Sequence, residues 1–275
     1  MIGLDRRAEP SFDVTDGVGV QRAFESVRPD VVYHLAAYAH VGDSWSEPDL
    51  VARVNVEGTV NVLDAARHVE ASRVLVVGSA AEYAGVAAAR PITEDAPIDP
   101  VTPYGASKAA AAAFARQAFL GSGLATVRTR AFNHAGPGQA PTFLVPALAQ
   151  RIARAEAEGR DEIAVGSLEP VREVNDVRDI VRAYRLLVER GTPGDVYNVC
   201  SGHGYSVREI VERLLAMATR PLRIAVDPAL VRPVDVPSFV GDPTKLRTAT
   251  GYAPQYSLDD TLAAALDEAR AAVRA

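Results

Sequence analysis

Val74-Leu-Val-Val-Gly-Ser79 is the stretch of sequence that decides the fold. Its four consecutive apolar residues predict a strand that is buried on both faces, which is typical of a parallel sheet. Similar apolar runs before and after it alternate with longer helical patterns. Strands are predicted at residues 31–35, 74–77 and 125–130, and helices at residues 49–69 and 103–120. This alternation predicts an α/β fold with helices on both faces of a parallel sheet.

The pattern becomes less regular after residue 130. Short strands are predicted at residues 163–165 and 196–200, and helices at residues 143–158, after Asn175, from Ser206 and from about Leu258. We therefore predict that residues 1–165 form the core of the protein. Residues 166–275 are predicted to complete the sheet and to form a small α+β lobe over its edge.

The composition is that of an ordinary globular protein, with 48% hydrophobic and 23% charged residues in a chain of 275. The net charge of −6 provides no basic surface, so nucleic acid is not an expected partner. The single cysteine, Cys200, excludes an intrachain disulfide, and the five histidines share no metal-ligand spacing, so no metal is expected. His34 is predicted to lie in the core. No apolar stretch reaches the roughly 18 residues of a membrane span, and no signal-peptide pattern follows Met1, so we expect a cytoplasmic protein.

Tyr104 and Lys108 lie one turn apart on the same face of the predicted helix, which begins at Pro103. A free phenol titrates near ~10, and a neighbouring ammonium is expected to lower the pKa of Tyr104 toward the range of a working acid or base. The hydroxyl of Ser79, at a separate strand end, can then hold a carbonyl or an alcohol against the phenol. A solvated helix face is the alternative for Tyr-x-x-x-Lys alone. The positions of Ser79 and Pro103 favour proton transfer coupled to hydride transfer.

A glycine-rich turn is absent from the chain. Residues 1–5, Met-Ile-Gly-Leu-Asp, predict a strand that ends at an acidic residue, as the second strand of a dinucleotide-binding fold does. The glycine-rich turn normally lies about 20 residues earlier, and no Gly-x-Gly-x-x-Gly occurs later between a strand and a helix. The first strand and helix, with their pyrophosphate cradle, are therefore missing here. We expect their loss to leave a gap in the sheet or a marginally stable protein.

Several motifs together resemble the extended short-chain dehydrogenase/reductase family of nucleotide-sugar enzymes. They are Asp13-Val-Thr-Asp16, His34-Leu-Ala-Ala37, Asn55-Val-Glu-Gly-Thr-Val-Asn-Val-Leu63, Ser79, Tyr104-x-x-x-Lys108 and Phe132-Asn-His-Ala-Gly-Pro-Gly138. The match runs in order from Asp5 to the C-terminus. The resemblance implies a Rossmann-like, doubly wound parallel sheet without its first strand and helix, and a small substrate lobe.

Within that family the chain is most similar to the reductases of GDP-4-dehydro-6-deoxy-D-mannose. The similarity lies in residues 132–139, 165–169, 176–184, 196–202 and 232–237, followed by Gly241-Asp242. It implies reduction of the C4 ketone of a nucleotide sugar to give GDP-D-rhamnose, with NADH slightly favoured over NADPH. Tyr104 would donate the proton, Lys108 would bind the nicotinamide ribose, and Ser79 would hold the C4 oxygen.

The resemblance also implies a set of cofactor contacts besides Tyr104 and Lys108. They are Asp5, Arg6, Asp13, Val14, Leu35, Ala36 and Ala37. Asp5 would accept the hydroxyls of the adenosine ribose, whereas Arg6 beside it suits a 2′-phosphate. Asp13 and Val14 would contact the adenine. The alternative is that Asp5 and Asp13 are strand-end and turn carboxylates.

Contacts with the substrate are implied for Asn133, Arg172 and Arg232 in addition to Ser79. The two arginines suit diphosphate oxygens or the base. Surface charges are the alternative for the arginines, and a loop residue that satisfies its own backbone is the alternative for Asn133. Glu82 is predicted either at the rim of the sugar pocket or as a plain surface carboxylate.

Two other enzyme activities of the family are alternatives to reduction. The 4,6-dehydratases place a glutamate two residues after the serine or threonine, where this chain has Ala81. Alternation along an extended segment points Glu82 away from that position, which disfavours dehydration. A 4-epimerase of UDP- or dTDP-sugars that retains NAD stays open, as does a nucleotide-sugar-binding relative without turnover.

Two further expectations concern the length of the natural protein and its oligomeric state. We expect the natural protein to have about 30 more residues at its N-terminus, the size of one strand–helix unit, with a shortened and inactive chain as the alternative. The alanine-rich segment Ala109–Ala113 would let another helix approach closely, so a homodimer is expected. Plain helix-forming alanine explains that segment equally well.

Overall fold

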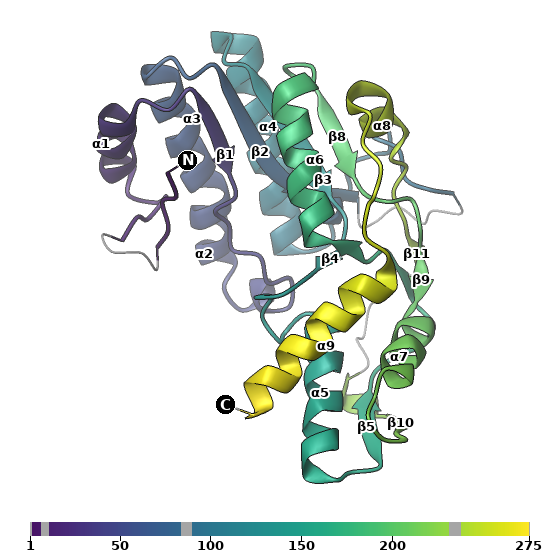
Figure 1. Ribbon diagram of the computed structural model, residues 1–275. Helices are drawn as coiled ribbons and strands as arrows, with labels where there is room; N and C mark the ends of the chain where they lie inside the picture. Colours follow the sequence, from purple (N-terminus) through teal and green to yellow (C-terminus); the bar gives the residue numbers. More distant parts are fainter. Residues whose placement is uncertain (1, 7–10, 84–89, 231–237, 275) are drawn as a thin grey trace.

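The computed structural model describes residues 2–6, 11–83, 90–230 and 238–274 (Figure 1). The helices are α1 (Gly17–Val27), α2 (Pro48–Ala52), α3 (Gly58–His68), α4 (Pro103–Ser122), α5 (Leu144–Glu158), α6 (Val177–Arg190), α7 (Val207–Ala216), α8 (Thr244–Thr250) and α9 (Leu258–Arg274). The strands are β1 (Val31–His34), β2 (Arg73–Ser79), β3 (Thr126–Ala131), β4 (His134–Ala135), β5 (Glu162–Val165), β6 (Val171–Arg172), β7 (Asn175–Asp176), β8 (Val196–Val199), β9 (Tyr205–Ser206), β10 (Arg223–Val226) and β11 (Ser238–Phe239).

A four-stranded parallel sheet in the order β1–β2–β3–β8 forms the core. Successive side chains of a strand point to opposite faces, so β2 contributes to both. Val74 and Val76 pack with α1, α3 and α4 on one face, whereas Leu75 packs with α6 and α8 on the other (Figure 1). The predicted α/β sheet with helices on both faces is confirmed.

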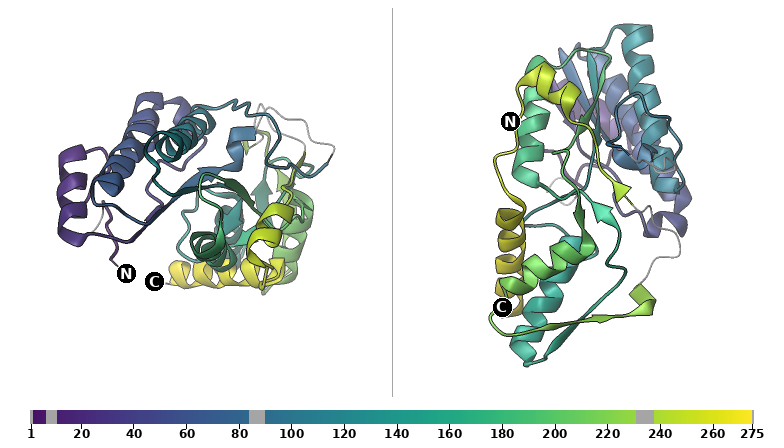
Figure 2. Two further views of the ribbon diagram at one scale, coloured as in Figure 1. Left: turned by 90° about the horizontal axis from the view of Figure 1, so that it is seen from above. Right: turned by 90° about the vertical axis from the view of Figure 1, so that its right-hand side faces the viewer.

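The smaller lobe has a hydrophobic core of its own, built from α5, α7, α9 and the parallel pair β5–β10. It lies beyond the carboxyl ends of the sheet strands (Figures 1 and 2). The structure differs from the predicted division at residue 165 in one respect: α5 and β5 precede this residue but pack in the lobe. As predicted for residues 166–275, α6, β8 and α8 complete the sheet core. Periodicity shows which face of an element is buried, but not the element against which it packs.

Residues 2–5, predicted as a strand, form no strand in the structure. The predicted strand is therefore wrong, because a strand is stable only when a neighbour satisfies its backbone, and none of the described strands pairs with these residues. β1 consequently forms an edge of the sheet. Tyr33 of β1 pairs in register with Leu75 of β2, but it is 36% exposed, whereas Leu75 is fully buried.

We expect Tyr33→Lys to lower the tendency of the 275-residue chain to self-associate. An unpaired, apolar edge strand is a template for another chain, and an edge lysine opposes such pairing. Sedimentation velocity over a range of concentrations measures the effect. The control is Val181→Lys, which also removes an exposed apolar side chain, here 60% exposed on α6. Equal association of the two variants would contradict the role of β1.

Buried polar side chains tie the segment after β1 to the helices beside it. Tyr38 N donates to Asn55 Oδ1 at 2.7 Å, and Asn55 Nδ2 donates to Ser107 Oγ at 2.9 Å, which joins this segment to α4. His34 is buried and its Nε2 lies 3.0 Å from Thr59 Oγ1. Burial lowers the pKa of His34 to about 3, so the ring is neutral and its predicted place in the core is confirmed. None of the helices among the described residues is long and apolar enough to cross a membrane.

Candidate functional site

The candidate active site forms where β2 ends and α4 begins. Pro103 is the first residue of α4, and Thr102 caps the helix by accepting a hydrogen bond from Gly105 N at 3.0 Å. A Cβ atom on Gly105 would lie 2.5 Å from the carbonyl oxygen of Ala81, so only glycine lets this turn pack so closely against the segment after β2. The close approach brings Tyr104 to Ser79.

The three predicted catalytic side chains lie together and are largely buried: Ser79 is 8% exposed, Tyr104 9% and Lys108 6%. Ser79 Oγ accepts a hydrogen bond from Ala81 N at 3.1 Å, and the phenol of Tyr104 lies close enough to the Ser79 side chain to be influenced by it. Lys108 Nζ donates to the carbonyl oxygen of Val77 at 2.7 Å. Two separate elements therefore present a hydroxyl, a phenol and an ammonium in one buried corner.

The charge states in this corner differ from the prediction. Burial raises the pKa of Tyr104, with the Ser79 side chain opposing it, and Lys108 is not among the groups that shift it. The expected lowering of the Tyr104 pKa by Lys108 is therefore wrong for this structure: the ammonium is turned to a main-chain carbonyl, and desolvation dominates. Burial also lowers the pKa of Lys108 to about 8, and the carboxylate of Glu82 opposes that change.

The low pKa of Lys108 predicts a pH-dependent stability. Between about pH 8 and its ordinary value of 10.5, the folded protein has released this proton while the unfolded chain still binds it. Because the unfolded state then binds more protons, the contribution of Lys108 to the free energy of unfolding rises with pH, by roughly 3 kcal/mol over the interval. Urea unfolding of the wild type and Lys108→Met at about pH 7, 8.5 and 10 measures it. The difference in unfolding free energy, wild type minus variant, should rise with pH; a constant difference would contradict the expectation.

Glu82 lies neither at the rim of a pocket nor on the surface, so both predictions for it are wrong. Its side chain is 1% exposed and forms an ion pair of 2.9 Å with Arg130 of β3, which is itself buried. The residues after β2 form a 3₁₀ turn, Ala80–Tyr83, which points the side chain of Glu82 into the interior toward Arg130. The prediction assumed an extended segment, which would not have placed the side chain there. Arg130 was not identified from the sequence, although a charged residue inside an apolar strand normally requires a buried partner.

The residues predicted to contact a cofactor divide into exposed and buried ones. Asp5, Arg6, Asp13, Leu35 and Ala36 are exposed, and Ala37 is partly exposed. Asp13 Oδ1 accepts hydrogen bonds from the backbone N–H and the hydroxyl of Thr15, which lower its pKa and stabilise a turn. Val14 is the exception: its side chain is 7% exposed and packs in the core beside Gly58, which leaves only its backbone for the predicted contact with adenine.

Two of the residues predicted to contact the substrate, Asn133 and Arg172, are among the described residues. Asn133 is exposed two residues after the end of β3, and its carbonyl oxygen accepts hydrogen bonds from the backbone N–H and the side-chain amide of Asn175. Arg172 is in β6, partly buried, and its NH1 donates to the carbonyl of Val171. Arg232 lies outside the described residues. Nothing in the described structure tests whether these side chains bind a ligand.

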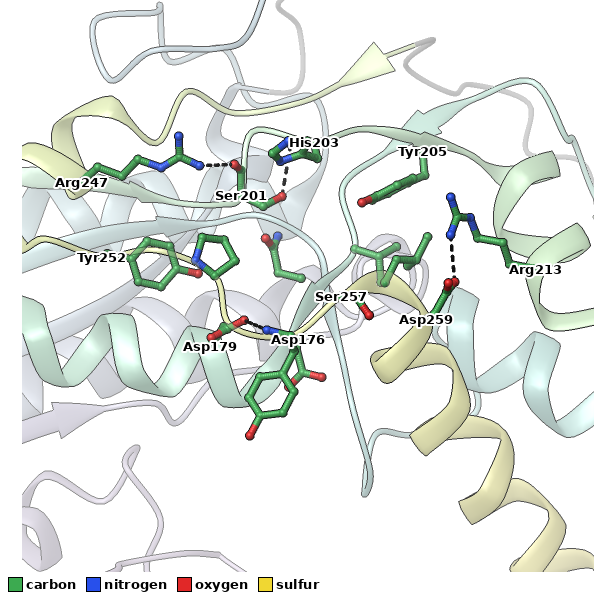
Figure 3. A pocket seen from close by; sticks show the side chains of 15 residues that line it. Asp176, Asp179, Ser201, His203, Tyr205, Arg213, Arg247, Tyr252, Ser257 and Asp259 are labelled. Atoms are coloured by element: carbon green, nitrogen blue, oxygen red, sulfur yellow. Dashed lines mark hydrogen bonds and ion pairs between the residues drawn. The ribbon is translucent and has the colours of Figure 1, made fainter. Parts of the chain in front are cut away.

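A cavity of about 380 Å³ lies elsewhere, between β7, the start of α6, the segment after β8 and the segment that leads into α9 (Figure 3). Its carboxylates are already engaged: Asp179, for example, accepts from Arg182 and from the backbone N–H groups of Gln255 and Tyr256. Ser79, Tyr104 and Lys108 do not line it. No group of three or more metal-ligating side chains occurs within the described ranges.

A parallel α/β sheet with a serine at a strand end and Tyr-x-x-x-Lys on the next helix defines an enzyme of the short-chain dehydrogenase/reductase type. The family model described as GDP-mannose 4,6 dehydratase matches residues 9–265. The chain belongs to this family, whose members include nucleotide-sugar dehydratases and, among the relatives of the chain, reductases and epimerases.

Three relatives show the extent of the similarity. The GDP-6-deoxy-D-mannose reductase of Pseudomonas aeruginosa is 34% identical over 249 residues, which cover 90% of this chain and 82% of that protein. The solved structure of RMD from Pseudomonas aeruginosa complexed with NADPH has a TM-score of 0.87 at 31% identity, covering 95% of this chain and 88% of the other. The UDP-glucose 4-epimerase of Thermus thermophilus in complex with NAD has a TM-score of 0.85 at 29% identity, covering 95% and 84%.

Proposed function

We propose that the chain reduces the C4 ketone of a nucleotide-activated 4-keto-6-deoxy sugar with NADH or NADPH, and that the substrate is GDP-4-dehydro-6-deoxy-D-mannose. The product would be GDP-D-rhamnose. The observation that carries the proposal is the meeting of Ser79, Tyr104 and Lys108 in one buried corner. The base and the sugar are inferred from the similarity to the GDP-6-deoxy-D-mannose reductase.

The residues in the corner fit the nicotinamide end of the cofactor. An ammonium has three donors, and in the described structure Lys108 Nζ has one acceptor, the carbonyl of Val77. The remaining N–H groups suit the hydroxyls of a ribose. At the other end of the site, exposed Asp5 suits the adenosine ribose, which supports a modest preference for NADH. When bound, the cofactor supplies the hydride.

Tyr104 acts in this proposal as the general acid. Reduction of a ketone places negative charge on its oxygen, and a phenol donates its proton to that oxygen as the charge develops. The raised pKa of Tyr104 suits this role, because the phenol stays protonated at neutral pH. Ser79 orients the same oxygen by a hydrogen bond, and the burial of both side chains limits competition from water. Asn133, Arg172 and Arg232 would hold the sugar and the diphosphate.

Dehydration is disfavoured by the placement of the carboxylates after β2. Removal of a C5 proton needs a base beside the sugar, and position 81 is an alanine. Glu82 faces Arg130 in the interior and is not available for that step. Incubation with GDP-mannose and NAD⁺ or NADP⁺ should therefore yield no 4-keto-6-deoxy sugar.

The direct test uses enzymatically prepared GDP-4-dehydro-6-deoxy-D-mannose with NADH and, separately, NADPH. Loss of nicotinamide absorbance with formation of GDP-D-rhamnose, identified by NMR, would support the proposal. The UDP-glucose 4-epimerases of similar structure supply the alternative, in which NAD copurifies with the protein and UDP-glucose is epimerised without added cofactor. A folded protein that binds the sugar nucleotide but neither turns it over nor binds a nicotinamide cofactor would be a binding protein.

The rate of reduction should fall as the pH rises above about 8. The fall follows from Lys108, whose lowered pKa of about 8 means that the charge beside the nicotinamide ribose is lost in this range. Tyr104 loses its proton only at higher pH. A profile of kcat/KM from about pH 6 to 10 measures the descending limb. A rate that is constant across this range would contradict the role of the Lys108 charge.

A further inference from the structure

Two oppositely charged side chains, Glu82 and Arg130, lie in the interior next to Ser79. Glu82 is 1% exposed and Arg130 is 6% exposed, so neither is placed to touch a substrate. An ion pair buried to this degree is costly to desolvate and is not by itself a source of stability. Because Glu82 is hydrogen-bonded to the backbone of Ser79, the pair is placed to position this active-site residue.

The hydrogen bonds of Glu82 fix the end of β2. One carboxylate oxygen, Oε1, accepts the backbone N–H of Ser79 at 3.0 Å, and the other, Oε2, accepts Arg130 Nε at 2.9 Å. A Cβ atom on Gly78 would lie 2.5 Å from Oε1, so the carboxylate occupies space that only a glycine leaves open. Because both oxygens are occupied as acceptors, the ionised form is the one that suits the site.

Arg130 in turn is held from three directions. Besides Glu82, its NH1 donates to the hydroxyl of Tyr83 and to the carbonyl oxygen of Glu94, the latter at 3.0 Å. The Tyr83 hydroxyl donates to Asn198 Oδ1 in β8 at 2.9 Å. The position of the Ser79 backbone is thereby coupled to β3, to β8 and to the segment at residue 94.

Glu82 is also the acidic group that acts on both titrating side chains of the site. Its charge raises the pKa of Tyr104 and that of Lys108, and no other acid is among the causes for either. The charged or titratable groups near Glu82 are Arg130 and Arg128 from β3, Lys108 and Tyr104 from α4, and Tyr83 from its own turn; Glu94 lies beyond Arg130. In the proposed reduction both Tyr104 and Lys108 must carry their protons.

We propose that the Glu82–Arg130 pair is the positioning element of this active site, holding Ser79 against Tyr104 and supplying the anion opposite Lys108. The inference rests on the proposed reduction and extends it to two residues that never contact the substrate. A pair with a purely structural role would affect folding stability alone. A positioning pair must also change the titration of Tyr104 and the pH dependence of the rate.

The test compares Glu82→Gln with a matched control, Glu156→Gln. The glutamine side chain keeps the shape and an oxygen acceptor but removes the charge. Glu156 is also paired with an arginine, Arg270, at 2.7 Å, but it joins α5 to α9 in the smaller lobe. For Glu82→Gln we expect kcat to fall about tenfold with little change in KM, and the descending limb of the pH profile to move about one pH unit lower. The control should change neither.

A second readout does not depend on turnover. In protein labelled with [ζ-¹³C]tyrosine, the Tyr104 resonance is assigned with Tyr104→Phe and titrated in the wild type and in Glu82→Gln. Loss of the negative charge should move its midpoint to lower pH. If Glu82→Gln does not fold, the Glu82→Gln/Arg130→Met variant, which removes both charges, gives the same comparison.

The outcomes separate the two proposals. A lower Tyr104 midpoint without any turnover of the 4-keto sugar nucleotide by the wild type would contradict the proposed function but leave the positioning role intact. Turnover by the wild type with an unchanged Tyr104 titration and an unchanged pH profile in folded Glu82→Gln would overturn the positioning role. Loss of stability alone, equal to that of the control, would overturn it as well.

Discussion

Replacing Tyr104 by phenylalanine is expected to lower kcat for reduction of the 4-keto sugar nucleotide by about 10²- to 10⁴-fold, the usual contribution of a positioned general acid. The substitution removes only the phenol oxygen, and the ring keeps its place in the first turn of α4. KM should change far less, because the proton is transferred in the transition state and not in the ground-state complex. Steady-state oxidation of NADH or NADPH at saturating sugar nucleotide measures the effect.

Two comparisons make this result interpretable. Tyr256→Phe removes a hydroxyl from a tyrosine that lines the separate cavity, and it should leave kcat unchanged. Binding of NADH to Tyr104→Phe, followed by nicotinamide fluorescence, should resemble that of the wild type, because Lys108 is retained. Full activity of Tyr104→Phe would exclude the phenol as the acid. Loss of cofactor binding would instead indicate that the Tyr104 hydroxyl helps to hold the cofactor.

Arg130→Met is expected to reduce the free energy of unfolding by roughly 3–5 kcal/mol, the typical cost of removing one partner from a buried ion pair. The substitution leaves the carboxylate of Glu82, 1% exposed, without its counter-charge, and it also removes the donors to Tyr83 and to the Glu94 carbonyl. The loss would be a large fraction of the ~5–15 kcal/mol by which a typical domain is stable. Urea unfolding followed by circular dichroism gives the free energy.

The double variant Glu82→Gln/Arg130→Met tests the cause of that loss. If the uncompensated charge dominates, removal of the glutamate charge should restore a substantial part of the lost stability, because a neutral amide costs less to bury than an isolated carboxylate. If the lost hydrogen bonds of Arg130 dominate, the double variant should be no more stable than Arg130→Met. Exposed ion pairs such as Arg208–Glu169 should contribute much less, so Arg208→Met is the control.

Local sequence patterns were sufficient to predict most of the sheet and the proximity of Ser79, Tyr104 and Lys108. The apolar runs at residues 74–77 and 196–200 became β2 and β8, because a run that is apolar on both sides is stable only inside a covered parallel sheet. Thr102 and Pro103 mark the start of α4 because capping and proline chemistry are local. The spacing of Tyr104 and Lys108 then put both side chains on one helix face.

Predictions that depended on neighbours far away in the sequence were less successful. Residues 2–5 have the composition of a strand but no strand beside them, and Val14 points into the core formed by α1 and α3. Glu82 looked like a surface or rim residue because its partner, Arg130, lies 48 residues later in another strand. The direction of the Tyr104 pKa shift was wrong because spacing identified its ionic neighbour but not the extent of its burial.

The sequence by itself determined the fold class, the strand-end serine, the Tyr-x-x-x-Lys helix and the absence of a glycine-rich turn, since each depends on residue type, period or spacing along a few turns of chain. Tertiary structure alone decided that α5 belongs to the smaller lobe, that β1 forms an edge, and that Glu82 and Arg130 form a buried pair under Ser79. Desolvation and pairing depend on what surrounds a group in three dimensions, and segments distant in the sequence provide those surroundings.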